Sequence, residues 1–182
     1  KTGALPLEKT DFELSLSGGT ATLASKNPTS IMKTETGYKL TIGINGLADG
    51  SEKLTIDLAS DAVFDGNENV ANASQSNNVL SLREKTPPTI VSTTLSEDNI
   101  KAVVTMSEPV FKASNGTGAL QTTDFSLALT GGSATLQNST PTAISVDGNK
   151  YTLTISYNGV ANGTETLTIT PVANNIFDAM GN

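Results

Sequence analysis

The sequence contains no cysteine, no histidine and no tryptophan in its 182 residues. Without cysteine, the chain has no disulfides, no thiol nucleophile and no cysteine-ligated zinc or iron–sulfur site. Without histidine, it cannot hold a Ser-His-Asp or Cys-His catalytic site or most transition-metal centres. Functions that depend on carboxylates, on oxygen-bound cations or on the shape of a surface are not excluded.

Positive charge and long hydrophobic runs are also scarce. The chain has 11 Lys and Arg against 18 Asp and Glu, which gives a net charge of -7 and a pI of about 4.5. Nucleic acids and anionic membranes bind basic surfaces, so we expect neither as a partner. No apolar run approaches the roughly 18 residues of a membrane helix, so we expect no membrane insertion.

The sequence repeats itself within the chain. A segment that begins at Asp11 with DFELSLSGGTATL matches a segment that begins at Asp124 with DFSLALTGGSATL, at a constant offset (124 − 11 = 113). The match continues without a gap over residues 11–69 and 124–182, with 27 identities in 59 positions. Internal similarity of this kind is typical of repeat proteins.

The chain is shorter than two periods of this repeat. We therefore expect residues 1–85 to be the C-terminal part of one repeat without its first strands, and residues 86–182 the N-terminal part of the next without its last strand. Pro87 and Pro88 mark the boundary, because consecutive prolines do not continue a sheet ladder. An unpaired sheet edge invites other strands, so we also predict strand exchange within the chain or in a homodimer.

Alternation of apolar and polar residues predicts short strands throughout, and no stretch has a sustained period of about 3.6 residues. Gly-Gly, Asn-Gly and Asp-Gly pairs between the strands are typical of tight turns. We predict an all-β chain built of tandem antiparallel β-sandwiches, with a small closed barrel as the alternative. The predicted strands cover residues 38–44, 54–58, 80–82, 100–106, 125–129, 151–157 and 167–169.

Four short motifs come in a characteristic order: Pro87-Pro-Thr-Ile-Val91, Ser107-Glu-Pro-Val110, Tyr151-Thr-Leu-Thr-Ile155 and Phe177-Asp-Ala-Met-Gly-Asn182. This order resembles the bacterial immunoglobulin-like (Ig-like) repeats of S-layer proteins and large surface adhesins. The resemblance covers residues 86–182 directly and residues 1–85 through the internal repeat. It implies tandem Ig-like sandwiches, an extracellular or cell-surface location in a bacterium, neighbouring repeats as partners, and no catalytic residues.

Two acidic turns form the candidate metal site. Asp and Asn side chains offer the oxygen ligands of Ca²⁺, which binds about six to eight of them. Calcium would stiffen the chain at these turns, but Asp and Asn also bond their own backbone in turns, so a purely structural role is the alternative. The candidate ligands are Asp61, Asp65, Asn67, Asn69, Asp178 and Asn182.

Other carboxylates suggest two further sites. Glu97, Asp98 and Glu108 would share a cation at a junction, or else serve as strand-end charges. Glycoside hydrolysis needs two carboxyl groups about 5–10 Å apart. Two carboxylates, Asp11 and Glu52, recur as Asp124 and Glu165, but a catalytic pair built twice with few aromatics beside it is not expected.

A ligand-binding surface is the remaining alternative. Sugar-binding faces use exposed aromatic rings, whereas Tyr38 and Tyr151 share the apolar side of their strands and are expected in the core or at its edge. Tyr157 replaces Ile44 and is specific to the second copy, and the copies diverge most in the loops 24–37 and 137–150. We predict a non-enzymatic structural spacer of a repetitive surface protein, with a carbohydrate- or ligand-binding module as the alternative.

Overall fold

The computed structural model describes residues 5–182, which form antiparallel strands and two short 3-10 helices. This confirms the predicted all-β class. The chain divides into two compact units, unit 1 (Lys1–Thr86) and unit 2 (Pro87–Asn182), with the division at Pro87. In the described part of the chain, no helix has the length and apolar character needed to cross a membrane.

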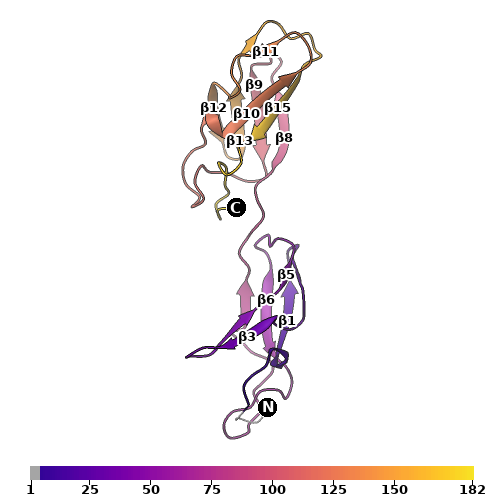
Figure 1. The fold of residues 1–182 in the computed structure, drawn as a ribbon, viewed down its shortest axis with the longest axis vertical. Helices are drawn as coiled ribbons and strands as arrows, with labels where there is room; N and C mark the ends of the chain where they lie inside the picture. The colour runs from indigo at the N-terminus through magenta and orange to yellow at the C-terminus, as the bar shows by residue number, and fades with distance from the viewer. Residues whose placement is uncertain (1–4) are drawn as a thin grey trace. The chain divides into compact units, whose positions relative to one another are not determined.

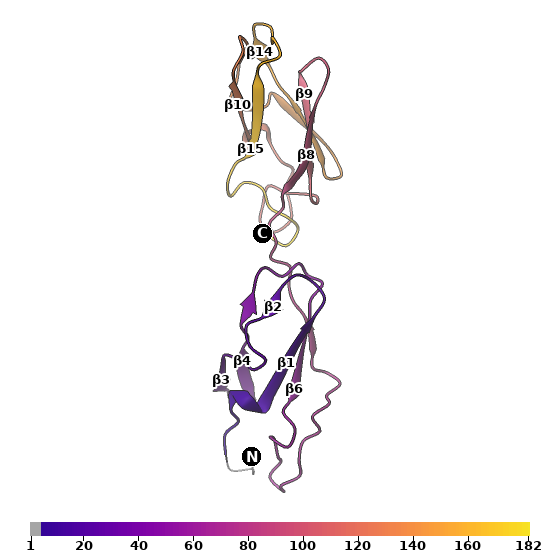
Figure 2. The same cartoon turned by 90° about the vertical axis from the view of Figure 1, so that its right-hand side faces the viewer.

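Unit 2 contains a four-stranded sheet, a two-stranded sheet and a short strand pair. In Figure 2, β8 and β9 lie on one side of the unit and β10 and β15 on the other. The four-stranded sheet has the order β12 (Ala143–Asp147), β13 (Lys150–Thr154), β9 (Lys101–Met106) and β8 (Ile90–Leu95). The two pairs are β10 (Phe125–Thr130) with β15 (Thr166–Pro171), and β11 (Thr135–Leu136) with β14 (Tyr157–Asn158).

The core of unit 2 follows from the period-2 alternation of its strands. Every second residue of β9 and β13 is buried, and these side chains pack against Phe125 of β10 and Ile169 of β15. The two sheets therefore share one apolar core. The buried members of the main cluster are Val104, Met106, Val110, Leu120, Phe125, Tyr151 and Leu153.

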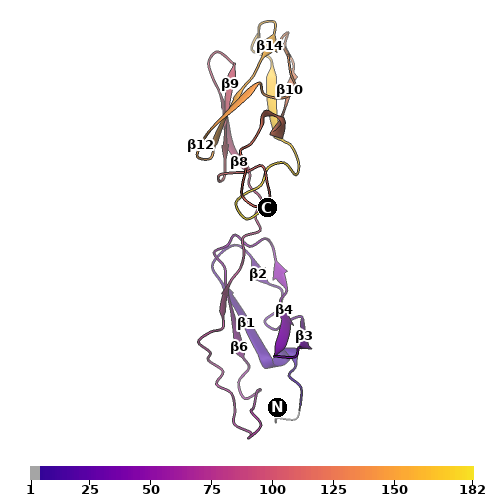
Figure 3. The same cartoon turned by 90° about the vertical axis from the view of Figure 1, so that its left-hand side faces the viewer.

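Unit 1 reuses the same strands with a different set of neighbours. Its three-stranded sheet has the order β1 (Phe12–Ser17), β6 (Lys53–Leu58) and β7 (Val79–Ser81). The pairs are β3 (Ser30–Lys33) with β4 (Tyr38–Thr41), and β2 (Thr22–Leu23) with β5 (Ile44–Asn45). Figure 1 and Figure 3 show β3 and β4 beside the sheet that contains β1 and β6.

The two units differ at opposite edges. Within residues 5–182, β4 pairs only with β3, whereas its counterpart β13 pairs with both β12 and β9. Conversely, β6 pairs with β1 and β7, whereas its counterpart β15 pairs only with β10. Burial follows this pairing: Leu54 of β6 is buried while the equivalent Leu167 of β15 is half-buried.

Several predicted boundaries were wrong. Strands β3 and β12 lie in the stretches expected to be loops, because each carries only one partly buried isoleucine and shows no clear alternation. The predicted strand 38–44 is divided after Thr41, where pairing changes from β3 to β2, and 151–157 is divided in the same way. Strand β8 was not predicted from alternation because most of its side chains are exposed.

Of the two tyrosines expected in the core or at its edge, only Tyr151 lies inside the core. The Tyr38 side chain is 38% exposed, whereas the equivalent Tyr151 is 1% exposed. The hydroxyl of Tyr151 accepts a hydrogen bond from Val110 N (2.9 Å) and donates one to Val110 O (3.1 Å). In unit 1, no described strand pairs with the edge of β4 that corresponds to the β9 side of β13, and the tyrosine there is open to solvent.

Candidate functional site

The acidic turn of unit 1 is organised by Asp65. Its Oδ1 accepts hydrogen bonds from Asn67 N (2.8 Å) and Asn69 N (2.9 Å), and its Oδ2 accepts one from Asn69 Nδ2 (2.9 Å). The pKa of Asp65 is lowered, first by the side-chain bond from Asn69 and then by the backbone bonds. The carboxylate is therefore a fixed acceptor for its own turn.

The turn of unit 2 has the same geometry around Asp178, which is fully buried. Its Oδ1 accepts from Met180 N (2.7 Å) and Asn182 N (2.9 Å), and its Oδ2 accepts from Asn182 Nδ2 (2.9 Å). Gly181 has a φ of +85°, whereas its counterpart Glu68 is forced to +65°. A non-glycine residue is strained at this φ, so Glu68 is strained because the first copy has no glycine at this position of the turn.

The structure thus brings most of the predicted metal ligands close together, but their carboxylates accept hydrogen bonds from the backbone and side chains of their own turns. Asp65 meets Asn67 and Asn69, and Asp178 meets Asn182, whereas Asp61 has a φ of 55° and accepts from the hydroxyl of its neighbour Ser60. Across the described residues, no group of three or more His, Cys, Asp or Glu side chains is close enough to hold a metal ion. Calcium binding stays a prediction.

A second recurring carboxylate, Glu52, joins two loops of unit 1. It precedes β6, is fully buried, and accepts hydrogen bonds from four backbone amides. Thr20 N and Ala21 N each lie 3.1 Å from Oε1. Gly50 N lies 3.1 Å from Oε2, and Asp49 N bonds both oxygens at 3.2 and 3.1 Å.

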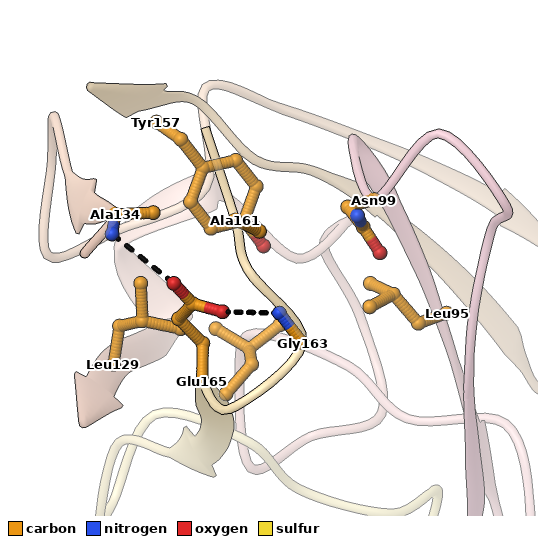
Figure 4. A pocket seen from close by; sticks show the side chains of 9 residues that line it. Leu95, Asn99, Leu129, Ala134, Tyr157, Ala161, Gly163 and Glu165 are labelled. Carbon is orange, nitrogen blue, oxygen red and sulfur yellow. Dashed lines mark hydrogen bonds between the residues drawn. The ribbon is translucent and has the colours of Figure 1, made fainter. Parts of the chain in front are cut away.

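Glu165 makes the same arrangement in unit 2 (Figure 4). Its Oε1 accepts from Ser133 N (2.9 Å) and Ala134 N (3.1 Å), and its Oε2 accepts from Gly163 N and Asn162 N, both at 3.0 Å. Glu165 is half-buried rather than buried. We call each set of one glutamate and four amides a carboxylate staple.

The staple explains the Gly-Gly pairs, which the sequence marks only as turns. A Cβ on Gly19 would lie 2.1 Å from Oε1 of Glu52, and a Cβ on Gly132 would lie 2.0 Å from Oε1 of Glu165. Both glycines also have positive φ values, +60° and +61°. The signal that could have revealed the staple is the joint recurrence, at one fixed spacing, of a Gly-Gly pair and a later glutamate.

The recurring Asp11 and Asp124 have a local structural role. Oδ2 of Asp11 accepts from Glu8 N and Oδ2 of Asp124 accepts from Gln121 N, each at 2.8 Å. These bonds close the short helices η1 (Lys9–Asp11) and η2 (Thr122–Asp124), which the sequence did not predict.

Asp124 has two further partners in unit 2. Its Oδ1 forms an ion pair with Lys112 Nζ and accepts from Asn175 Nδ2 (3.2 Å), while the Asp124 side chain is fully buried. Because the carboxylate is buried, it needs this compensation. The sequence alone did not indicate Lys112 or Asn175 as partners of Asp124.

The carboxylates do not form a hydrolase pair in either unit. In the antiparallel pairing of β1 and β6, Phe12 lies opposite Leu58 and Ser17 lies opposite Lys53. Asp11 and Glu52 therefore flank opposite ends of a six-residue pair, which spans about 20 Å. That separation exceeds the spacing of glycosidase carboxyl groups.

The carboxylates predicted to share a cation at a junction are also far apart, at opposite ends of β9. Asp98 lies in the turn between β8 and β9, where it accepts from Ser96 Oγ (2.5 Å) and Ile100 N (3.2 Å), and these bonds lower its pKa. Glu108 follows the other end of β9. Asp98 is thus a turn acceptor, distant from Glu108.

One cavity of about 310 Å³ lies beside the staple of unit 2 (Figure 4). Leucines from β8, β10 and β15 line it together with Tyr157 and Asn99. Burial raises the pKa of the Tyr157 hydroxyl. Glu165 also lines the cavity, but both of its oxygens are already bonded to backbone amides.

The staples make stability depend on acid pH. The pKa of each glutamate is lowered from 4.5 to about 2. For Glu165, the largest cause of the lowered pKa is the hydrogen bond from Ala134 N. For Glu52, the largest single effect is burial, which raises the pKa. The hydrogen bonds from Ala21 N, Asp49 N and the other backbone amides together outweigh burial and lower the pKa. A lowered folded-state pKa stabilises the fold above pH 4.5, and this contribution disappears as the pH falls toward 2.

We therefore expect Glu52→Gln to lower the unfolding temperature of unit 1 at neutral pH by about 5 °C or more, because the amide places a donor against backbone donors. The difference from the unmodified chain should shrink between about pH 4.5 and 2. Thermal unfolding measures the change, and a separate hydrogen-exchange experiment shows which unit is destabilised. Glu165→Gln is the matched variant in unit 2. A difference that stays constant with pH would refute the staple as a charged group.

No family model, curated protein or solved structure matches the chain. Its function is therefore inferred from the internal repeat and from the geometry of these sites.

Proposed function

We propose that the chain is a non-catalytic structural spacer of a repetitive bacterial surface protein, made of parts of two consecutive Ig-like β-sandwich repeats. One observation carries this proposal: the carboxylates that recur between the units bind their own backbone. Both staples, both acidic turns and both aspartates of the short helices hold loops together. Recurring carboxylates that bind their own backbone fit a scaffold.

The surface composition supports the same role. The chain carries a net charge of -7 and only 4% aromatic residues. A net negative charge keeps neighbouring repeats soluble and separate, and few rings are available to hold a ligand. We place the protein outside the bacterial cell, where its resemblance to surface repeats implies that it extends a distal domain.

A spacer must unfold in discrete steps when it is stretched. With the chain pulled from its two ends, we expect two separate extensions of about 300 Å each, one per unit, since a stretched chain spans about 3.5 Å per residue. Unit 1 should yield at the lower force, because both clusters of buried hydrophobic residues found in the described part of the chain lie in unit 2. Single-molecule force spectroscopy measures both quantities. A gradual extension without steps would contradict the spacer role.

Calcium is proposed as a stiffening ion at the turns of Asp65 and Asp178. If the turns bind calcium with a Kd of about 10 μM, 1 mM calcium stabilises the native state by about 2.7 kcal/mol. We expect thermal unfolding in excess EDTA and then in calcium to show this rise, and Asp65→Ala and Asp178→Ala to abolish it. Asp→Asn at the same positions is the control that retains an oxygen acceptor. An unchanged midpoint would leave both residues as turn acceptors only.

The cavity beside Tyr157 supports a second proposal, a ligand-binding module that uses the loops of unit 2. Tyr157 is the aromatic that the first copy replaces with Ile44, and the cavity offers its ring, aliphatic side chains and Asn99. Glycans are the ligand class implied by a polar, loop-based surface. The spacer role is preferred because the charged group at this cavity is committed to the staple.

A further inference from the structure

Three side chains of unit 2 with complementary chemistry meet at Asp124. Lys112 offers an amine, Asn175 offers a side-chain amide, and both contact Oδ1 of the Asp124 carboxylate. An amine and an amide join with release of ammonia when a positioned acid–base group carries the proton. We propose that Lys112 and Asn175 form an isopeptide bond within unit 2, with Asp124 as the proton carrier. The proposal goes beyond the spacer role, since it concerns a bond made once inside one unit.

The two reacting groups are close together. Asn175 Nδ2 lies 3.2 Å from Oδ1 of Asp124, and Lys112 Nζ forms an ion pair with the same oxygen. Because both nitrogens lie one hydrogen-bond length from one atom, they are at most about 6 Å apart. A nucleophile reacts from about 3–3.5 Å. Since Cγ of Asn175 is bonded directly to Nδ2, rotation of the long lysine side chain is the movement that brings Nζ to Cγ.

Backbone hydrogen bonds fix the three segments that carry these groups. Phe111 N donates to Phe177 O (2.7 Å) and Phe177 N donates to Phe111 O (2.9 Å), which pairs the segment of the lysine with the segment of the asparagine. Val172 N donates to Asp124 O (2.9 Å), and Asn175 N donates to Val172 O (3.2 Å). Reactants oriented in advance lose little entropy on reaching the transition state, so this framework favours the reaction.

Burial favours proton transfer between the lysine and the aspartate. The Asp124 side chain is 0% exposed and the Lys112 side chain is 35% exposed. A buried ion pair has lost much of its hydration, so its conversion to a neutral amine and a neutral acid is easier than in water. Oδ2 of Asp124 accepts from Gln121 N (2.8 Å), which leaves Oδ1 as the oxygen that exchanges the proton.

The reaction balances without an oxidant or a reductant. Oδ1 of Asp124 takes a proton from the Lys112 ammonium, and the lone pair freed on Nζ forms a bond to Cγ of Asn175. Asp124 then carries a proton from Nζ to Nδ2, and the Cγ–Nδ2 bond breaks. The released ammonia takes the first proton with it as ammonium. Asp124 ends as a carboxylate, and the chain has lost one positive charge.

The helix-closing role of the aspartate does not account for the asparagine. Asp11 corresponds to Asp124 in the internal repeat, and both accept the backbone bond that closes their short helix. At the same offset, Ala62 stands where unit 2 has Asn175. Alanine has no amide carbon to attack. Unit 1 therefore keeps the helix-closing carboxylate without the asparagine, and the bond is expected in unit 2 only.

The mass of the unmodified full chain tests the proposal. The chain is denatured, its intact mass is measured by mass spectrometry, and it is digested with trypsin, which cuts after lysine and arginine. We expect an intact mass below that of the sequence by one ammonia molecule. We also expect residues 102–150 to stay uncut at Lys112 and to be joined to residues 151–182, because trypsin does not cut after a lysine whose amine is in an amide.

Two variants and a control locate the bond. Lys112→Arg and Asn175→Ala should each restore the full mass and separate the two peptides. Lys101→Arg is the matched control in the same unit and should keep the linked peptide. A full intact mass in the unmodified chain would overturn the proposal, and this result does not depend on the folding of any variant. So would ammonia loss confined to one unlinked peptide, since Asn115-Gly116 can lose ammonia by cyclising on its own backbone.

Force spectroscopy separates this proposal from the spacer role. The bond closes a loop of 63 residues (175 − 112 = 63) that force does not extend. Unit 2 should then lengthen by about one third of the roughly 300 Å expected for a chain without the bond, and Lys112→Arg should restore the full length. Two full-length steps in the unmodified chain would overturn the cross-link and still support the spacer.

Discussion

A β-sheet satisfies its backbone and buries its apolar face only as far as its strands have neighbours, and this constraint governs the whole chain. The two units share their strands, registers and turns, yet their burial differs wherever the neighbours differ. Leu54 is buried where β7 is present, and Leu153 is buried where β9 is present. Each unit is therefore well packed at one edge and open at the other.

The recurring carboxylates also satisfy backbone groups, but in loops and turns rather than in the sheets. Glu52 and Glu165 collect amides from two loops, while Asp65 and Asp178 collect amides from one turn. Hydrogen bonds from several donors stabilise the charged form of a carboxylate, and they lower the pKa of Glu52, Glu165 and Asp65. These carboxylates thus bind the loops and turns of the chain itself, which is the observation behind the proposed scaffold role.

Much of this could be predicted from the sequence, for physical reasons. Strands such as β9 and β13 bury alternate residues, so their period of two is visible, and the internal repeat predicted equivalent residues in both copies. The staples were not predicted, because each glutamate lies far along the sequence from the Gly-Gly loop whose amides bind it, and only folding joins them. The exposure of Tyr38 depends on a strand that residues 5–182 do not provide, so its own sequence could not reveal it.

The central claim is that one period of the repeat is one folding module. The most direct test is a chain in which residues 87–182 are followed by residues 70–86, which adds β7 beside β15 and restores one full period. Its thermal unfolding is compared with that of residues 87–182 followed by the same added segment in scrambled order. We expect a higher midpoint and slower exchange along β15 in the full period. Equal midpoints would contradict it.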